Sequence, residues 1–287
     1  MKFKMIFYIL IGILCGVSFA DDEEIDYGTI DEKYAVSDQE FKIRMNIDGG
    51  EIHVSRNDQS NECHVRLEYN PEHGTADVRF YEKRNELEID LDFDDIKFWK
   101  NDHHDDSWNS EVWVELPYKS PITMETDIKA GESKFTLGDI SLRDFEFNIW
   151  AGEVTIDFDK PNRIEMDVFD VSVHIGETEL LNLGNANLSE AVINGGIGEL
   201  RIDFRGESQR RAMARVDLDI GETTIILPEQ LGVKMKVSKF LFLSDIQYPD
   251  WFERKGRYFY SENYQENEKS LYLDISTGIG ELKVRID

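Results

Sequence analysis

Cysteine and long apolar runs are scarce in this sequence of 287 residues. Of the two cysteines, Cys15 lies inside an apolar run at residues 5–17, and Cys63 stands alone in the rest of the chain. Loss of the N-terminal segment would leave Cys63 without a partner for an internal disulfide. The run has 13 residues, fewer than the ~20 that cross a bilayer, and no second run follows. The sequence thus excludes a disulfide-rich scaffold and predicts no transmembrane helix.

The N-terminus has the pattern of a cleavable secretory signal. Lys2 and Lys4 precede the apolar run, and Ser18-Phe19-Ala20 places small residues at positions −3 and −1 of a cleavage site. We therefore interpret residues 1–20 as a signal peptide. The protein is expected to be exported, to the periplasm or to the extracellular cell surface, with no membrane insertion after cleavage.

Basic residues are few, since 32 lysines and arginines stand against 59 aspartates and glutamates, a net charge of −27. Cleavage of residues 1–20 removes two lysines and makes the charge −29. A field of this sign repels nucleic acid and anionic lipid headgroups and favours cationic partners. Its simplest consequence is solubility.

Helical periodicity is absent, whereas strand-like alternation recurs along the chain. Phe41, Ile43, Met45 and Ile47 are apolar with polar residues between them. A period of two is typical of half-buried strands. The fold class is therefore expected to be all-β.

The dipeptide Gly-Glu recurs at regular intervals from Gly131 onward. The regularly spaced copies begin at Gly131, Gly152, Gly176, Gly198, Gly221 and Gly280, and the first five are 21, 24, 22 and 23 residues apart. A fixed period in the low twenties is typical of a solenoid of stacked repeats. We expect a β-solenoid-like stack of about 22-residue repeats at residues 116–287, after an acidic leader at 21–36 and an N-terminal β region at 37–115.

The six glycines are predicted to be corner residues. The residues two and four positions after each glycine are mostly apolar, as at Leu200 and Ile202, and so is the residue before it, as at Ile197. If all face the core, the odd step from Ile197 to Leu200 changes the inward face across Gly198. A bend with glycine at its centre does this.

Stacking of the repeats would also align their glutamates, about 4.8 Å apart. Such a ladder of like charges must be exposed to solvent or offset by basic neighbours. Arg201 is expected to reach Glu177 or Glu222 on an adjacent repeat, as a surface ion pair of ~0–1 kcal/mol.

The interval from Gly221 to Gly280 is 59 residues long and holds an aromatic insertion at about residues 232–268. Trp, Tyr and Arg dominate binding hot spots, and aromatic faces stack on sugars. The candidate binding residues are Trp251, Phe252, Arg254, Arg257 and Tyr258. The alternative is a cap, because the end of a solenoid must be sealed.

Several segments carry a family resemblance. They are, in order, Leu116-Pro117, Ile128-Lys129-Ala130-Gly131-Glu132, Ile149-Trp150-Ala151-Gly152-Glu153, Asn194-Gly195-Gly196-Ile197-Gly198-Glu199, Leu227-Pro228 and Thr277-Gly278-Ile279-Gly280-Glu281. The chain thereby resembles the toast-rack family, the putative-adhesin group related to the C-terminal domain of LiaF-like cell-wall-active antibiotic response proteins. The resemblance implies a stack of short strands and an envelope role such as adhesion, sensing or scaffolding, without catalytic residues.

Motifs for catalysis are missing: the sequence has no His-Glu-x-x-His helix, Gly-x-Ser-x-Gly elbow, P-loop or nucleotide-binding glycine fingerprint. The aspartates between Asp90 and Asp106 match no EF-hand loop, so a solvated charge run is favoured over a Ca²⁺ site. We therefore expect no catalytic residue, no metal site and no cofactor.

The sequence favours an exported, non-enzymatic binding or scaffolding module of the cell envelope, whose partner is an envelope protein or a glycan. One alternative is a carbohydrate-active β-helix enzyme, which would combine clustered acids with a basic residue such as Arg201, Arg210 or Arg211. Another is a structural adhesin stabilised by Ca²⁺.

Overall fold

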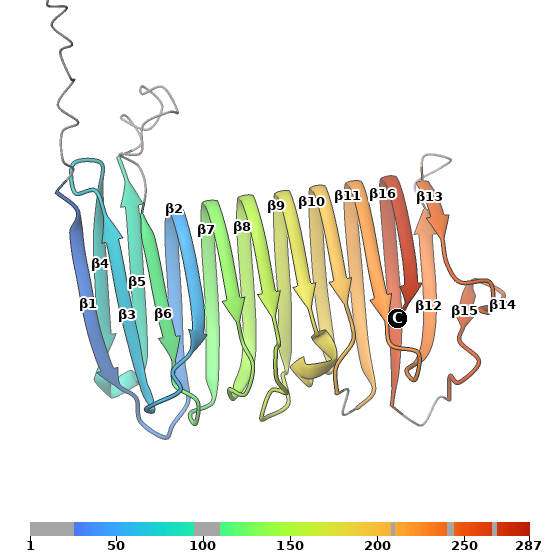
Figure 1. The fold of residues 1–287 in the computed structure, drawn as a ribbon, viewed down its shortest axis with the longest axis horizontal. Helices are drawn as coiled ribbons and strands as arrows, with labels where there is room; N and C mark the ends of the chain where they lie inside the picture. Colours follow the sequence, from blue (N-terminus) through green and yellow to red (C-terminus); the bar gives the residue numbers. More distant parts are fainter. Residues whose placement is uncertain (1–25, 95–109, 208–209, 240–243, 266–268) are drawn as a thin grey trace, which may run out of the picture.

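The computed structural model describes residues 26–94, 110–207, 210–239, 244–265 and 269–287. The expected signal peptide, residues 1–20, lies outside these ranges. Within them the regular structure is almost entirely strand, with two short 3-10 segments, η1 (Glu82–Arg84) and η3 (Leu183–Ala186). No helix there has the length and apolar character that crossing a membrane requires. The expected all-β class is confirmed (Figure 1).

The described strands join in one sheet of sixteen. Its first strands are β1 (Gly28–Ala35), β2 (Phe41–Arg56), β3 (Glu62–Tyr69), β4 (Gly74–Tyr81), β5 (Glu86–Phe93), β6 (Glu111–Leu116), β7 (Ile122–Thr136) and β8 (Leu142–Asp157). The others are β9 (Val168–Leu181), β10 (Glu190–Asp203), β11 (Ala212–Leu227), β12 (Gly232–Lys239), β13 (Ser244–Gln247), β14 (Glu253–Lys255), β15 (Tyr258–Tyr260) and β16 (Ser270–Ile286).

Long parallel strands form the centre of the sheet, in the order β2-β7-β8-β9-β10-β11-β16. Their register places each of the six predicted corner glycines opposite the next, so that Gly198 lies between Gly176 and Gly221. The same register includes Gly50 on β2, opposite Gly131, so the Gly50-Glu51 pair is a further position of the repeat that the sequence spacing did not predict. Equivalent side chains of neighbouring strands therefore stack along the sheet.

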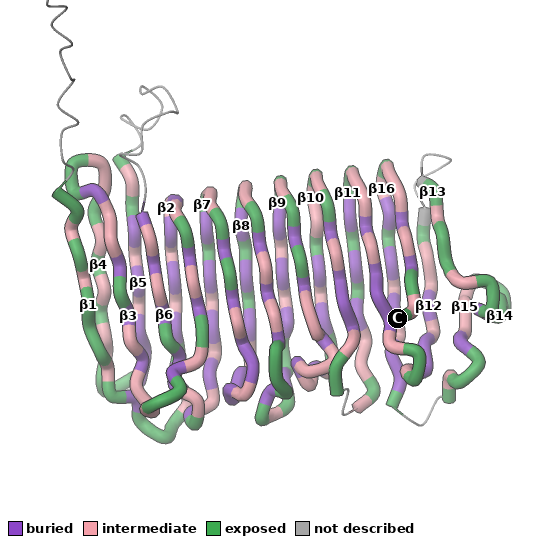
Figure 2. Tube along the Cα trace, in the orientation of Figure 1, coloured by how far each residue is buried: buried purple, intermediate pink, exposed green. Residues whose placement is uncertain are grey.

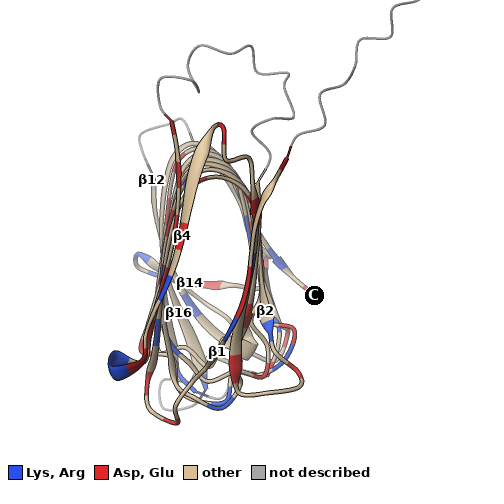
Figure 3. Cartoon of the chain, turned by 90° about the vertical axis from the view of Figure 1, so that its left-hand side faces the viewer, with Lys and Arg blue, Asp and Glu red and all other residues tan. Residues whose placement is uncertain are grey.

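Each long strand bends at its glycine, and the sheet folds into two walls that meet along the upper edge in Figure 1. We call the residues before the glycines the first wall and those after them the second wall; Figure 3 shows both walls end-on. The six predicted corner glycines have φ between +141° and +156°. At Gly198 a Cβ would stand 1.8 Å from the carbonyl oxygen of Gly176, so only glycine fits there.

The core fills the space between the walls, where buried and exposed residues alternate along each strand (Figure 2). Phe135 of the second wall meets Phe145 and Phe147 of the first wall edge-on, with ring centroids 5.9 and 5.3 Å apart. Cys63 is also fully buried, and burial raises the pKa of its thiol. Burial of apolar side chains from both walls is the main source of stability, at roughly 1.5–3 kcal/mol for each large side chain.

One prediction about the bend is wrong. The alternation predicts that the apolar residue before each glycine, alanine or isoleucine, faces the core, but Ile197 is 51% exposed. On β7 the last inward residue of the first wall is Ile128 and the first of the second wall is Ser133. The bend thus takes up the four residues between them, and the apolar residue just before the glycine points outward at the edge of the sheet. The step from Ile128 to Ser133 is five residues, an odd number, so the inward-facing positions of the strand do change across the bend, as predicted.

At the N-terminal end, two separate strands continue the two walls. β5 pairs with the first half of β2 and β6 with its second half, both parallel. Beyond them β4 and β3 pair antiparallel with β5 and β6, and β1 lies outermost beside β3. The N-terminal strands are therefore continuous with the central sheet.

At the C-terminal end the order of strands departs from the order of the sequence. β16, the last strand, lies between β11 and β12. β12 pairs with the first half of β16 and β13 with its second half, while the β14–β15 hairpin extends the first wall beyond β12. The long interval between Gly221 and Gly280 therefore contains the strands β12 to β15, which lie beyond β16 in the sheet although they precede it in the sequence.

Candidate functional site

The predicted binding residues lie at the C-terminal end of the first wall, in and before the β14–β15 hairpin. This hairpin is held on the sheet by antiparallel pairing of β15 with β12. Directly opposite residues share a face of the sheet, so Lys234 of β12 lies beside Tyr260 of β15 on one side and Tyr272 of β16 on the other. The register therefore gathers aromatic and basic side chains from separate parts of the chain.

Three tyrosine rings surround the ammonium group of Lys234 on the outward face. The Nζ atom lies 4.5 Å from the ring centroid of Tyr258, 5.3 Å from that of Tyr272 and 5.9 Å from that of Tyr260. These distances lie within the range of cation–π attraction. We call this group, with Lys236, Arg257 and Asp274, the tyrosine–lysine patch.

Ion pairing and burial give the patch its electrostatic character. Lys236 Nζ donates to the two carboxylate oxygens of Asp274 at 2.8 and 2.9 Å, and this hydrogen bond raises the lysine pKa. Partial burial, followed by the charge of Asp274, raises the pKa of Tyr272. The guanidinium of Arg257 lies 5.1 Å from the Tyr258 ring centroid. The patch is thus an aromatic surface held by cations, on a chain that is otherwise strongly acidic.

The structure brings together only part of the predicted set. Arg257 and Tyr258 belong to the patch, but Arg254 pairs with Phe259, which faces the core, and so lies on the other face of β14. Phe252 is buried, with 6% of its surface exposed. Trp251 is 40% exposed and stacks on Phe252 at a centroid distance of 4.8 Å.

Sequence reasoning missed Lys234 and Tyr272. Both lie on strands whose polar side chains alternate with buried Val233, Met235, Leu271 and Leu273. That alternation was a usable signal for the outward face. The pairing of β12 with β16 was not, because it joins residues far apart in the sequence.

A second surface feature runs along the other wall. The register aligns one row of outward carboxylates across the sheet, made of Glu68, Glu111, Glu51, Glu132, Glu153, Glu177, Glu199, Glu222, Glu281 and Asp245. We call this the glutamate row. Lys283 pairs with both Glu222 and Glu281 at 2.9 Å, and its hydrogen bond lowers the pKa of Glu222. Within the described residues, the four central glutamates from Glu132 to Glu199 have no ion-pair partner.

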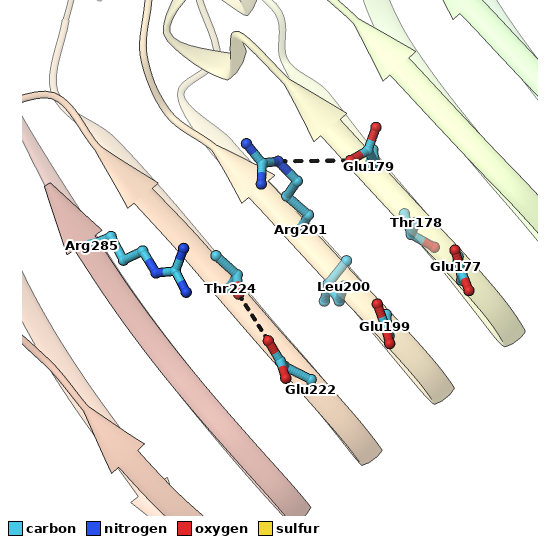
Figure 4. Close-up of a pocket in the computed structure, with 9 residues that line it drawn as sticks. All are labelled: Glu177, Thr178, Glu179, Glu199, Leu200, Arg201, Glu222, Thr224 and Arg285. Atoms are coloured by element: carbon cyan, nitrogen blue, oxygen red, sulfur yellow. Dashed lines mark hydrogen bonds and ion pairs between the residues drawn. The ribbon is translucent and has the colours of Figure 1, made fainter. Parts of the chain in front are cut away.

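A shallow groove of about 290 Å³ crosses this row between β9 and β16 (Figure 4). Arg201 in the groove contacts Glu179 at 3.7 Å, so the expectation that it reaches Glu177 or Glu222 is wrong. The reason is the register, which places Glu179 directly opposite Arg201. Arg210 lies elsewhere, in an ion pair with Glu165.

The aspartate run is only partly described. Asp90 accepts hydrogen bonds from Asn46 at 2.7 Å and Arg79 at 2.6 Å, whereas residues 95–106 lie outside the described ranges. Over the part of the chain that is described, no group of three or more His, Cys, Asp or Glu side chains is placed to hold a metal ion.

One protein-family model matches most of the chain. It represents the N-terminal domain of toast_rack, DUF2154, and matches residues 18–180 and 161–226. A search of curated proteins gives no significant match.

Several solved structures align with most of this chain, at low sequence identity and low TM-score. A putative cell adhesion protein from Clostridium sporogenes is 15% identical, with a TM-score of 0.45, over 91% of this chain and 100% of its own. A putative adhesin from Bacteroides fragilis is 13% identical, with a TM-score of 0.36, over 90% and 97%. A putative adhesin from Parabacteroides merdae is 8% identical, with a TM-score of 0.29, over 91% and 96%.

Proposed function

The chain belongs to the toast-rack family, and on that premise we propose that it is an exported, non-enzymatic, adhesin-like binding module of the cell envelope. Export is supported by the signal-like pattern of residues 1–20. A β-solenoid-like stack of about 22-residue repeats is part of the proposal, supported by the glycine-to-glycine register of the central strands.

The observation that carries the proposal is the tyrosine–lysine patch. Tyrosine rings on the outward face of a sheet offer flat apolar area and hydroxyl groups for hydrogen bonds. Lys234 holds three of these rings in one cluster, so little side-chain entropy remains to be lost when a ligand binds. Sugar rings have apolar faces and polar edges of this kind. We propose a glycan of the envelope as the ligand.

An array of envelope polysaccharides tests this site. The protein without its first 20 residues is compared with a Tyr258→Ala, Tyr272→Ala double variant. Tyr118→Ala is the matched control, because Tyr118 is a half-buried tyrosine beside basic residues but outside the patch. The expected result is retention of a glycan by the wild type and the control and its loss from the double variant, with an unchanged circular dichroism spectrum.

Retention by the double variant as strong as by the wild type would contradict the site. If the double variant fails to fold, Lys234→Met provides the second test, since it removes the cation and leaves the three rings. Glycan binding unaffected by Lys234→Met and by both tyrosine changes would remove the patch from the proposal.

A further inference from the structure

A line of exposed isoleucines immediately precedes the bend glycines, at the edge where the two walls meet. This edge is the upper one in Figure 1. Ile175, Ile197, Ile220 and Ile279 are 44–51% exposed and lie side by side on β9, β10, β11 and β16. Neighbouring strands are about 4.8 Å apart, so this isoleucine rim is roughly 14 Å long. Ala151 and Ala130 continue the line onto β8 and β7.

The core is filled without these isoleucine side chains, which point to solvent. Val173 and Leu218 fill the interior just before the bend, and Leu200 fills it just after. A continuous apolar line of this kind on a strongly charged protein is unusual, because soluble chains keep exposed apolar groups scattered. Trp150, the most exposed large apolar side chain in the described residues, at 61%, lies close to the same edge on β8. The edge therefore has the character of a contact surface.

The glutamate row runs beside the rim, two residues further along each strand. Glu177 and Glu199 follow Ile175 and Ile197, and these glutamates have no ion-pair partner among the described residues. Asp219 adds a carboxylate on the other side, where it immediately precedes Ile220. Beside Ile220 and Ile279 the row is partly neutralised, because Glu222 and Glu281 share Lys283. An apolar line bordered by carboxylates, unpaired along β9 and β10, is complementary to a partner that is apolar and cationic on adjoining faces.

We propose that the isoleucine rim and the glutamate row together dock an amphipathic helix of a partner protein that carries lysine or arginine beside its apolar face. A helix rises ~5.4 Å per turn and the strands repeat every ~4.8 Å, so each turn meets one isoleucine and one glutamate. The slip is ~0.6 Å per turn, or ~2 Å over the rim, which a lysine side chain spans easily. A second copy of this chain is a poor occupant, since its own glutamate row repels the first.

This inference does not depend on the proposed glycan site. The rim lies at the bend between the walls, whereas the tyrosine–lysine patch lies on β12, β15 and β16. Changes on the rim are therefore expected to leave glycan binding intact, and either proposal can fail alone.

The test uses the chain without its first 20 residues and a synthetic helix of leucine and lysine, about 18 residues and ~27 Å long. A peptide with glutamate in place of lysine is the matched probe. Binding is measured by fluorescence anisotropy, and helix formation by circular dichroism. Two double variants of the protein are compared with the wild type. One combines Ile197→Ser with Ile220→Ser, and the other combines Glu177→Gln with Glu199→Gln. The controls are Val168→Ser, at an exposed valine away from the rim, and Glu190→Gln, at an exposed glutamate of the first wall.

The lysine peptide is expected to bind as a helix, the glutamate peptide not to bind, and each double variant to lose affinity by about tenfold or more, with the controls unchanged. Added salt should weaken binding to the wild type more than to the glutamine variant. Equal affinity of wild type and both double variants would overturn the proposal. So would a dimer of the free protein that the serine variant dissociates. If the serine variant does not fold, the glutamine variant alone decides.

Discussion

Gly198 approaches Gly176 so closely that a Cβ on Gly198 would stand 1.8 Å from the Gly176 carbonyl oxygen. Its φ of +147° is also one that residues with a side chain rarely adopt. The same close approach repeats at Gly221 and Gly280, where the distance is again 1.8 Å. The bend that joins the two walls therefore depends on backbone-to-backbone contact between glycines.

This contact predicts a strong effect of substitution at one residue and a weak effect at its neighbour. Gly198→Val should destabilise the protein by about 3 kcal/mol or more, from backbone strain and overlap with the next strand. Glu199→Ala should change stability by no more than about 0.5 kcal/mol, since this exposed side chain belongs to a row of like charges. Urea unfolding measures both. Equal midpoints for the two variants would contradict the corner assignment.

Substitution of Glu146, on the first wall, should change the stability of the protein in a pH-dependent way. Although its side chain is exposed, desolvation by neighbouring groups, and then the nearby charges of Glu125 and Asp170, raise the pKa of Glu146. The folded protein thus holds this proton more tightly than the unfolded chain, and the stability gained is lost as the pH rises through the folded-state pKa. Glu146→Gln should therefore raise Tm at pH 7 and leave it unchanged at about pH 3, where the carboxyl is protonated in both states. A lower Tm at pH 7 would show that the charge is favourable.

Lys234 should contribute to stability through the tyrosine rings around it. Lys234→Met keeps most of the side-chain volume and removes the charge, so we expect a loss of ~0.5–1 kcal/mol. Lys134→Met is the matched control, because Lys134 is an exposed lysine of the second wall. Chemical denaturation of the three proteins in parallel measures the difference. An equal effect of both substitutions would mean that the rings gain nothing from the ammonium group.

Metal removal is expected to leave the fold unchanged. The carboxylate of Asp90 is already engaged by Asn46 and Arg79. We therefore expect the same Tm in EDTA and in excess Ca²⁺, measured by differential scanning fluorimetry. A Tm that falls with the chelator and recovers with Ca²⁺ would favour the Ca²⁺-stabilised adhesin instead.

The straight parts of the strands could be predicted from sequence, and the bends could not. Alternation places Phe135, Ile156 and Leu200 on the inward face, and they are buried. Within the bend the backbone turns over four residues, so alternation no longer tells which side chain points inward. Ile197 is apolar like its inward neighbours and gives no signal of its exposure, which is why the rim was missed.

The pairing of strands that are distant in the sequence was the other feature that could not be predicted from it. The place of β16 between β11 and β12 depends on contacts that local patterns do not encode. The tyrosine–lysine patch depends on the same pairing, because Tyr272 joins Lys234 only through β16. From the sequence, the aromatic segment predicted Tyr258 and Arg257 but could not supply the lysine at the centre or the third ring.

We propose that the chain binds its ligand without catalysing a reaction on it. The most direct test incubates the protein, without its first 20 residues, with a panel of neutral and acidic polysaccharides, and follows both retention on the polymer and release of reducing ends. We expect retention of at least one polysaccharide with no release above a heat-denatured control. Time-dependent release of reducing ends or of unsaturated products would contradict it and identify the chain as a carbohydrate-active enzyme.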